Sequence, residues 1–264
     1  MCYDIKTSLE KQLRRAILDG NLQEINEINE KLSIFTPEQI ELNHASGFTH
    51  PKLIIYTEED LYTPIIATWG LVPYWVRDSQ QKNQLWNKTL NARAETMFDK
   101  PSFRQAARSG KCLIHIEGFY EHRHINKKTY PYYITSKNEE LLTVAGLYSK
   151  WYNPDLGEEI ITFSIVTTKA NNLMTKIHNN PKLKEPRMPL ILPTELENKW
   201  LLNAENPIDQ KLLNDLVLPF VEEELKAFTV APIKGKNSTG NTISATKPKE
   251  YAEVVAEDNK TTLF

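Results

Sequence analysis

The chain has 264 residues, a formal net charge of −2, and 40% hydrophobic and 25% charged residues. These proportions are ordinary for a globular protein that buries a sizeable core. The charge excludes a protein that is basic over its whole surface, and nine glycines are too few for long flexible tracts.

Cysteine usage and hydrophobic runs bear on the compartment. The cysteines are Cys2 and Cys112, and two are too few for a disulfide framework, which fits a reducing compartment. The first residues contain no long apolar run, and no stretch reaches the roughly 18 apolar residues that cross a membrane. We therefore expect a cytoplasmic protein without a membrane partner.

Charge is distributed unevenly along the chain. Residues 77–137 contain twelve Lys or Arg and five Asp or Glu, whereas residues 9–60 contain ten acids and five bases. A basic middle beside an acidic edge suits a protein that meets a polyanion on one face. A solvated surface with no such partner is the alternative.

The N-terminal pattern predicts a pair of helices. Thr7 and Glu10 have the spacing of a capping box, and apolar residues then recur at helical spacing as far as Ile17. Residues 22–32 repeat the pattern after a Gly-Asn break. We expect an antiparallel pair over 7–33, packed on the outside of the domain.

Beyond residue 50 the pattern changes to short apolar runs, which predict strands. Helices interrupt them without a βαβ rhythm, so we expect an α+β fold with a mostly antiparallel, barrel-like sheet. No linker divides the chain, so we expect one domain over 1–233 and a polar loop or tail over 234–264. The expected strands are 53–56, 65–69, 112–116, 131–134, 141–145 and 160–166, and the expected helical stretches lie within 78–109 and 169–178 and over 196–202 and 209–216.

The second residue offers a distinctive chemistry. Cys2 follows Met1 directly, and removal of Met1 would leave a free α-amine and a thiol on one residue. Their reference pKa values are about 7.7–8.0 and about 8.5, so both groups reach a reactive form near neutral pH. The amine can form a Schiff base with an aldehyde, and the sulfur can then close a five-membered thiazolidine.

Four further segments place polar residues beside apolar runs: WGLVPYW at 69–75, NARAET at 91–96, EGFYE at 117–121, and IH at 177–178 with RMP at 187–189. Together with Cys2 and TTKAN at 167–171, they resemble the SOS-response-associated peptidase (SRAP) family, whose members crosslink covalently to abasic sites in DNA. The resemblance implies the SRAP fold over the first 233 residues. It also implies single-stranded or junction DNA as partner, a monomeric protein that joins the nucleoid on damage, and no cofactor.

The resemblance implies four catalytic residues. Cys2 would attack C1′ of the ring-opened abasic sugar, and Asn91 would orient the sugar through its amide. Glu121 would exchange protons with the α-amine, and His178 would help to open the sugar ring and to reverse the adduct. The alternatives are a turn or cap for Asn91, a surface carboxylate for Glu121 with Glu117 as the competing residue, and a packed His178.

The resemblance also implies DNA contacts. Arg93 would bind a phosphate, with Arg187 as a second candidate, because the guanidinium fork matches phosphate oxygens. Pro73 and Trp75 would wedge or stack where a base is missing, with core packing as the alternative. Further candidates for DNA contact are Arg77, Arg104, Arg108 and Lys169.

The chain departs from the family pattern at three places. Tyr3-Asp4 stands where many members have Gly-Arg, and His122 stands where Trp is common. Residues 179–186 separate His178 from Arg187 and bring two lysines near the site. His122 and His124 beside Glu121 suggest metal ligands, but no second Cys or His pair completes a site, so no metal is expected.

The sequence as a whole favours an abasic-site processing protein that forms a thiazolidine through Cys2 and shields the lesion. The same site would account for autocatalytic removal of Met1. Two alternatives remain: a cysteine peptidase that uses Cys2 and His178, and a non-covalent reader of modified DNA bases.

Overall fold

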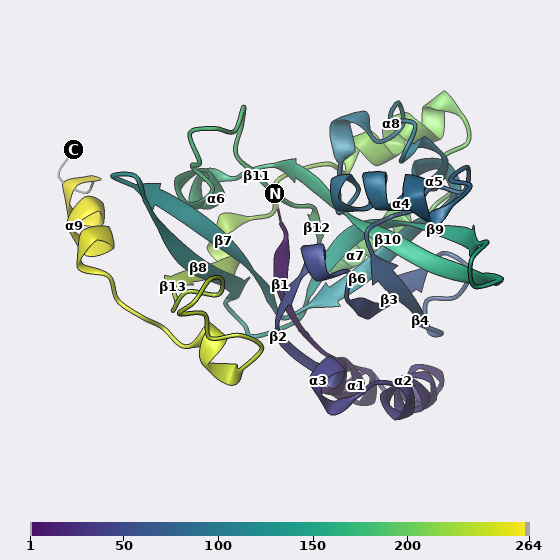
Figure 1. Ribbon diagram of the computed structural model, residues 1–264, viewed down its shortest axis with the longest axis horizontal. Helices are drawn as coiled ribbons and strands as arrows, with labels where there is room; N and C mark the ends of the chain where they lie inside the picture. The colour runs from purple at the N-terminus through teal and green to yellow at the C-terminus, as the bar shows by residue number, and fades with distance from the viewer. Residues whose placement is uncertain (1, 262–264) are drawn as a thin grey trace.

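The computed structural model describes residues 2–261, so the predicted removal of Met1 concerns a residue outside the described part of the chain. A closed barrel lies beside a second sheet (Figure 1). The barrel strands are β3 (Lys52–Thr57), β4 (Ile65–Trp69), β6 (Lys111–Ile116), β9 (Leu142–Asn153) and β10 (Glu158–Lys169).

The barrel closes because β9 pairs with β10 at the end of the series β10–β4–β3–β6–β9. Every pairing in this ring is antiparallel except the short contact of β4 with β10. The predicted α+β fold with a mostly antiparallel barrel is therefore confirmed. Three short strands extend the barrel sheet: β5 (Asn91–Arg93) and β11 (Arg187–Pro189) pair with β10, and β12 (Ile191–Leu192) pairs with β9.

The second sheet holds the N-terminal strand. Its order is β13 (Leu225–Thr229), β8 (Lys128–Ser136), β7 (Gly118–Ile125), β1 (Asp4–Ser8) and β2 (Glu41–Ser46), and all its pairings are antiparallel. One residue, Glu117, joins β6 of the barrel to β7 of this sheet. That short link fixes where the second sheet lies against the barrel.

The predicted helix pair is present as α1 (Leu9–Leu18) and α2 (Leu22–Ile34), followed by the short α3 (Pro37–Ile40). The predicted cap is wrong by one residue. Ser8 caps α1 by accepting a hydrogen bond from the Lys11 N–H at 3.2 Å. Thr7 lies in β1, where its hydroxyl donates to the His115 carbonyl at 3.0 Å and so serves the sheet.

The remaining predicted helices lie close to their expected positions. The stretch within 78–109 is interrupted by β5, because its NAR residues pair with β10 and do not continue a helix. The helices are α4 (Ser79–Leu85), α5 (Arg104–Ser109), α6 (Asn172–Ile177), α7 (Thr194–Trp200) and α8 (Pro207–Asp215). Short 3₁₀ segments lie at Gly47–Thr49, Trp86–Lys88, Ala94–Thr96, Glu222–Glu224 and Ile243–Thr246.

The C-terminal segment is more ordered than the sequence predicts, because α9 (Ala252–Thr261) stands in part of the expected loop. The Asp258 carboxylate binds the Arg123 guanidinium at 2.7 Å and the Lys176 ammonium at 2.8 Å. Since Arg123 is buried, this ion pair ties α9 to β7 (Figure 1). No helix within residues 2–261 is long and apolar enough to cross a membrane.

The glycine of WGLVPYW is required by its surroundings. Gly70 has a φ of +119°, and its N–H donates to the Phe163 carbonyl at 2.8 Å. Its carbonyl accepts from the indole of Trp86 at 2.7 Å, and the Trp86 ring stacks on His50. A Cβ at this position would lie 2.4 Å from the Trp86 ring and 2.8 Å from His50.

We expect Gly70→Ala to lower the free energy of unfolding by more than about 2 kcal/mol, because backbone strain and a steric clash act together. Gly240→Ala is the matched control, since Gly240 also has a positive φ but nothing lies within 4 Å of its added Cβ. The control should lose about 1 kcal/mol. Urea unfolding measures both, and equal losses in the two variants would contradict the role assigned to the Trp86–His50 stack.

Candidate active site

The N-terminal strand of the second sheet brings Cys2 alongside β7. Asp4 lies opposite Tyr120 in the pairing of β1 with β7, so the residues before Asp4 run alongside Glu121. Cys2 is 1% exposed, and its thiol lies 4.0 Å from the Asp4 carbonyl. Burial, and after it the charge of Glu121, raises the pKa of the Cys2 thiol.

Glu121 and His178 meet across the junction of the two sheets. The Oε2 atom of Glu121 lies 3.7 Å from Nε2 of His178, and both side chains are largely buried. The other carboxylate oxygen accepts the His122 N–H at 2.9 Å. Burial raises the pKa of Glu121, so its carboxyl group holds a proton more tightly than a solvated glutamate does.

His178 is held so that one ring nitrogen faces Glu121. It ends α6, and its backbone N–H donates to the Met174 carbonyl at 2.7 Å. Its Nδ1 lies 2.9 Å from both the backbone N and the backbone O of Arg187, so either neutral tautomer finds a partner there. Burial lowers the pKa of His178 to about 4, which leaves the ring neutral at neutral pH.

The second carboxylate of EGFYE faces other partners. Glu117 lies 3.5 Å from the Lys6 ammonium and 3.6 Å from that of Lys11. These ion pairs brace β1 and α1 against the link between the sheets. Of the two glutamates that compete in the sequence, Glu121 is therefore the one beside His178.

Asn91 carries an unsatisfied amide. It stands at the start of β5, where it lies opposite Ile165 of β10. Both its Oδ1 and its Nδ2 are buried, and neither has a hydrogen-bond partner among residues 2–261. Leaving a buried polar group unpaired costs roughly 1–3 kcal/mol, so this amide has hydrogen-bonding capacity that a ligand or water can satisfy.

The two predicted phosphate-binding arginines differ in exposure. Arg93 lies two residues after Asn91 in β5, so both side chains share one face of that strand. Arg93 is exposed, and its charge acts on the Tyr3 hydroxyl, whose pKa burial and Glu121 raise.

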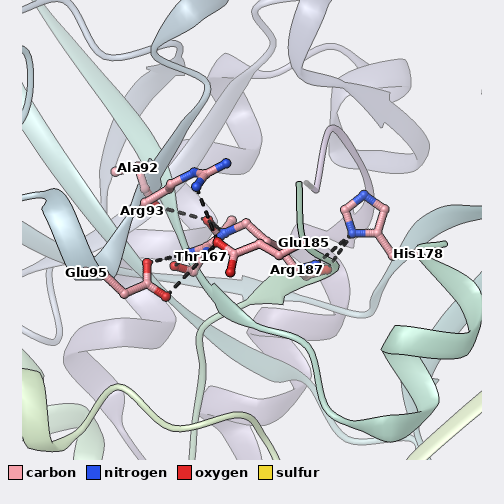
Figure 2. A network of polar contacts seen from close by, with 7 residues as sticks. All are labelled: Ala92, Arg93, Glu95, Thr167, His178, Glu185 and Arg187. Atoms are coloured by element: carbon pink, nitrogen blue, oxygen red, sulfur yellow. Dashed lines mark hydrogen bonds and ion pairs between the residues drawn. The ribbon is translucent and has the colours of Figure 1, made fainter. Parts of the chain in front are cut away.

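Arg187 is 1% exposed, and hydrogen-bond partners surround its guanidinium group (Figure 2). Glu95 binds both of its Nη atoms, at 3.2 and 2.7 Å, and Thr167 accepts at 3.3 Å from Nε and at 2.7 Å from Nη2. Arg187 thus joins β11 to β10, and it can bind a phosphate only by exchanging a partner.

The other residues that were predicted to contact DNA differ in how exposed they are. Pro73 is buried, and Trp75 is half-buried with its indole donating to the Pro101 carbonyl at 3.3 Å. Tyr74 between them is the exposed ring of the motif, at 64%, and it is not among the residues predicted to contact DNA. Arg77, Arg104 and Lys169 are exposed, and Arg108 is half-buried.

Position 4 has an unexpected partner. The Asp4 carboxylate lies 2.9 Å from the His44 ring and 2.6 Å from the Lys234 ammonium. Burial acts to raise the pKa of Asp4, but these two hydrogen bonds outweigh it and hold the pKa below its usual value. Lys234 therefore brings a positive charge beside β1. No local sequence pattern predicts this contact.

The histidines after Glu121 have separate surroundings. The backbone of His124 exchanges two hydrogen bonds with the Asn179 side chain, at 2.6 and 3.0 Å, and this fastens the start of the 179–186 segment to β7. Burial lowers the pKa of His122. Within residues 2–261, no three His, Cys, Asp or Glu side chains gather closely enough to hold a metal ion.

Known relatives share this arrangement of sequence and fold. The abasic site processing protein YoqW of Bacillus subtilis is 35% identical over 222 residues, which cover 80% of this chain and 89% of YoqW. The abasic site processing protein HMCES of Xenopus tropicalis is 32% identical over 163 residues, which cover 54% of this chain and 46% of HMCES.

Solved structures and the family model extend the likeness to nearly the whole chain. A crystal structure of a Bacteroides thetaiotaomicron protein has 32% identity and a TM-score of 0.77, and it covers 94% of this chain and 100% of that one. A Bordetella bronchiseptica protein has 26% identity and a TM-score of 0.60, over 69% and 84% of the two chains. The model of the SOS response associated peptidase (SRAP) family matches residues 7–236. This chain therefore belongs to the SRAP family.

Proposed function

We propose that this protein processes abasic sites in DNA by forming a thiazolidine between Cys2 and the ring-opened deoxyribose, and so shields the lesion from strand cleavage. The names of the relatives support abasic-site processing. The covalent step is supported by one observation above the others. The carboxylate of Glu121 lies 3.7 Å from the His178 ring and its charge acts on the Cys2 thiol, so these three groups lie close together.

The reaction requires that Met1 is first removed. While Met1 is attached, the nitrogen of Cys2 is a peptide amide and its buried thiol is protonated, so neither is a nucleophile. After removal, the α-amine adds to the C1′ aldehyde and water leaves as the imine forms. The sulfur then bonds to the same carbon, and the thiol proton passes to the nitrogen, which closes the thiazolidine.

Glu121 and His178 would move the protons of these steps. Glu121 accepts a proton from the α-amine and returns it to the departing hydroxyl, a task that its raised pKa assists. His178 is neutral, and its Nε2 faces Glu121 while the Arg187 backbone matches either tautomer. The ring can therefore take or give a proton at Nε2 during opening of the sugar and reversal of the adduct.

DNA would be held chiefly through its phosphates. Arg93, Arg77 and Lys169 are exposed cations on the elements that carry the motifs, and such contacts weaken as salt rises. We propose single-stranded or junction DNA, bound by a monomer, as the substrate, because a lesion there exposes its sugar. A cysteine peptidase is less favoured, since burial raises the pKa of the Cys2 thiol and a peptidase needs it lowered.

The decisive experiment mixes the protein with a single-stranded oligonucleotide that carries one abasic site and separates the products on a denaturing gel. Mass spectrometry first establishes that Met1 has been removed. The protein should give a shifted band that Cys2→Ala abolishes and that Cys112→Ser retains, because Cys112 is a buried thiol within the barrel. An oligonucleotide with a tetrahydrofuran analogue, which has no aldehyde, should give no band.

Each alternative has its own outcome in that experiment. Free oligonucleotide in every lane, with DNA binding intact, would identify a non-covalent reader. Chemical blocking of the α-amine separates crosslinking from peptidase chemistry, because a thiazolidine needs both groups and a peptidase needs only the thiol. A shifted band that survives amine blocking would contradict the thiazolidine.

We expect Asn91→Ala to slow crosslinking by about tenfold, the effect of losing one hydrogen bond to the sugar. The same change should leave the free energy of unfolding unchanged or slightly raised, because the amide it removes has no partner among residues 2–261. Gel kinetics and urea unfolding measure the two effects. A large loss of stability with unchanged crosslinking would make Asn91 a structural residue.

The protonation of His178 gives a test by pH. Its pKa of about 4 in the folded protein lies below the unfolded value of about 6.5. Above pH 6.5 both states are neutral, and as the pH falls towards 4 the unfolded state takes up the proton first. Stability should therefore fall in that window, with His178 contributing roughly 1–3 kcal/mol.

Two measurements check this dependence. NMR of labelled histidine should find the His178 ring still neutral at pH 5.5. Between pH 6.5 and 4.5 the free energy of unfolding should fall less in His178→Gln than in the wild type. Part of the fall should remain in the variant, because burial also lowers the pKa of His115. Titration of His178 near pH 6.5 would contradict the assignment.

A further inference from the structure

One carboxylate oxygen of Glu185 lies between two arginines. Its Oε1 is 3.3 Å from Nη1 of Arg93 and 3.0 Å from Nη1 of Arg187 (Figure 2). The two arginines come from strands on either side of β10, since Arg93 lies opposite Thr167 and Arg187 lies opposite Lys169. An oxyanion is thus held between two guanidinium groups at one end of the barrel sheet.

Arg187 has enough other hydrogen-bond partners to stay buried without Glu185. Glu95 already binds both of its Nη atoms, and the Thr167 hydroxyl and carbonyl accept two more hydrogen bonds. Arg93 and Glu185 are both partly exposed, at 45% and 39% of their side chains. An ion pair exposed to this extent contributes little to stability, so its carboxylate can be exchanged for another anion at small cost.

Glu185 is presented by a segment whose ends are fastened. Asn179 binds the backbone of β7 at His124, and the Ala170 N–H donates to the Pro186 carbonyl at 3.3 Å. Glu185 therefore stays beside the arginines by position and not only by charge. Lys182 and Lys184 of the same segment are exposed.

We propose that Glu185 occupies the place of a DNA phosphate at Arg93 and competes with the DNA backbone for that arginine. The ligand that displaces it is a phosphodiester, because a phosphate oxygen and a carboxylate oxygen make the same charge-assisted hydrogen bonds to a guanidinium group. The proposal rests on the proposed function in one respect, that DNA is the partner. Glu185 thereby weakens the non-covalent affinity for DNA without contacting the abasic sugar.

The experiment measures non-covalent binding by fluorescence anisotropy of a single-stranded oligonucleotide with a tetrahydrofuran abasic analogue. This DNA has no aldehyde, so the result is independent of crosslinking. Glu185→Gln should bind about two- to fivefold more tightly than the wild type, as expected for release of a partly exposed ion pair. In an Arg93→Ala background the same substitution should give no gain, because the arginine that it frees is absent.

Two control variants separate this role from general effects of charge and packing. Glu158→Gln removes the same charge at the other end of β10, about 30 Å from Thr167, and should change the affinity by less than about 1.5-fold because that distance exceeds the screening length. Glu95→Gln should lower the melting temperature, since it removes the main charge partner of buried Arg187, whereas Glu185→Gln should leave the melting temperature nearly unchanged.

The outcomes distinguish failure of this proposal from failure of the proposed function. Unchanged affinity in Glu185→Gln, or a gain that persists without Arg93, overturns the role of Glu185 even if crosslinking to an abasic oligonucleotide is intact. Absence of DNA binding in every variant overturns the proposed function together with this proposal. A gain in binding that depends on Arg93 supports the role of Glu185 whether or not a covalent product forms.

Discussion

The pairing of β1 with β7 determines what this site can do, because it fixes the start of the chain beside the carboxylate of Glu121. The link between the sheets is a single residue, Glu117, so β7 cannot shift far from the barrel strand that precedes it. The end of α6 then brings His178 to within 3.7 Å of Glu121. The strand that follows Cys2 pairs with β2 on one edge and with β7 on the other, which holds this segment in place.

Burial gives the site its electrostatic character. The same loss of solvent raises the pKa of the Cys2 thiol, raises that of Glu121 and lowers that of His178. All three shifts favour the uncharged form, since a charge in this environment loses its hydration. The Asn91 amide is buried as well, and it has no hydrogen-bond partner among residues 2–261. The site is thus arranged to gain hydrogen bonds when a polar ligand enters, and this gain is part of what a sugar would contribute on binding.

The sequence predicts the barrel better than the second sheet, for a physical reason. Barrel strands such as β6 and β10 are buried on both faces and read as continuous apolar runs. The strands β1 and β2 of the second sheet carry many polar residues, so only their pairing with each other and with β7 makes them strands. The motifs point to candidate residues, but the contacts of those residues depend on partners that no local pattern contains. Which of Glu117 and Glu121 lies beside His178, for example, follows only from the three-dimensional positions of Lys6, Lys11 and His178.

The two glutamates that bind Arg187 make the same kind of ion pair in two different environments. Glu95 binds a guanidinium that is 1% exposed, and removing Glu95 would leave this buried charge with only the partly exposed Glu185 as counter-ion. Glu185 binds at the rim, where solvent screens the charges and the pair is worth little. Under the proposed function the covalent bond itself would keep the protein on the lesion, so tight non-covalent binding would not be needed. Weak binding at the rim would let the protein leave DNA that offers no aldehyde, and an acidic residue beside Arg93, the proposed phosphate ligand, would be a direct way to achieve it.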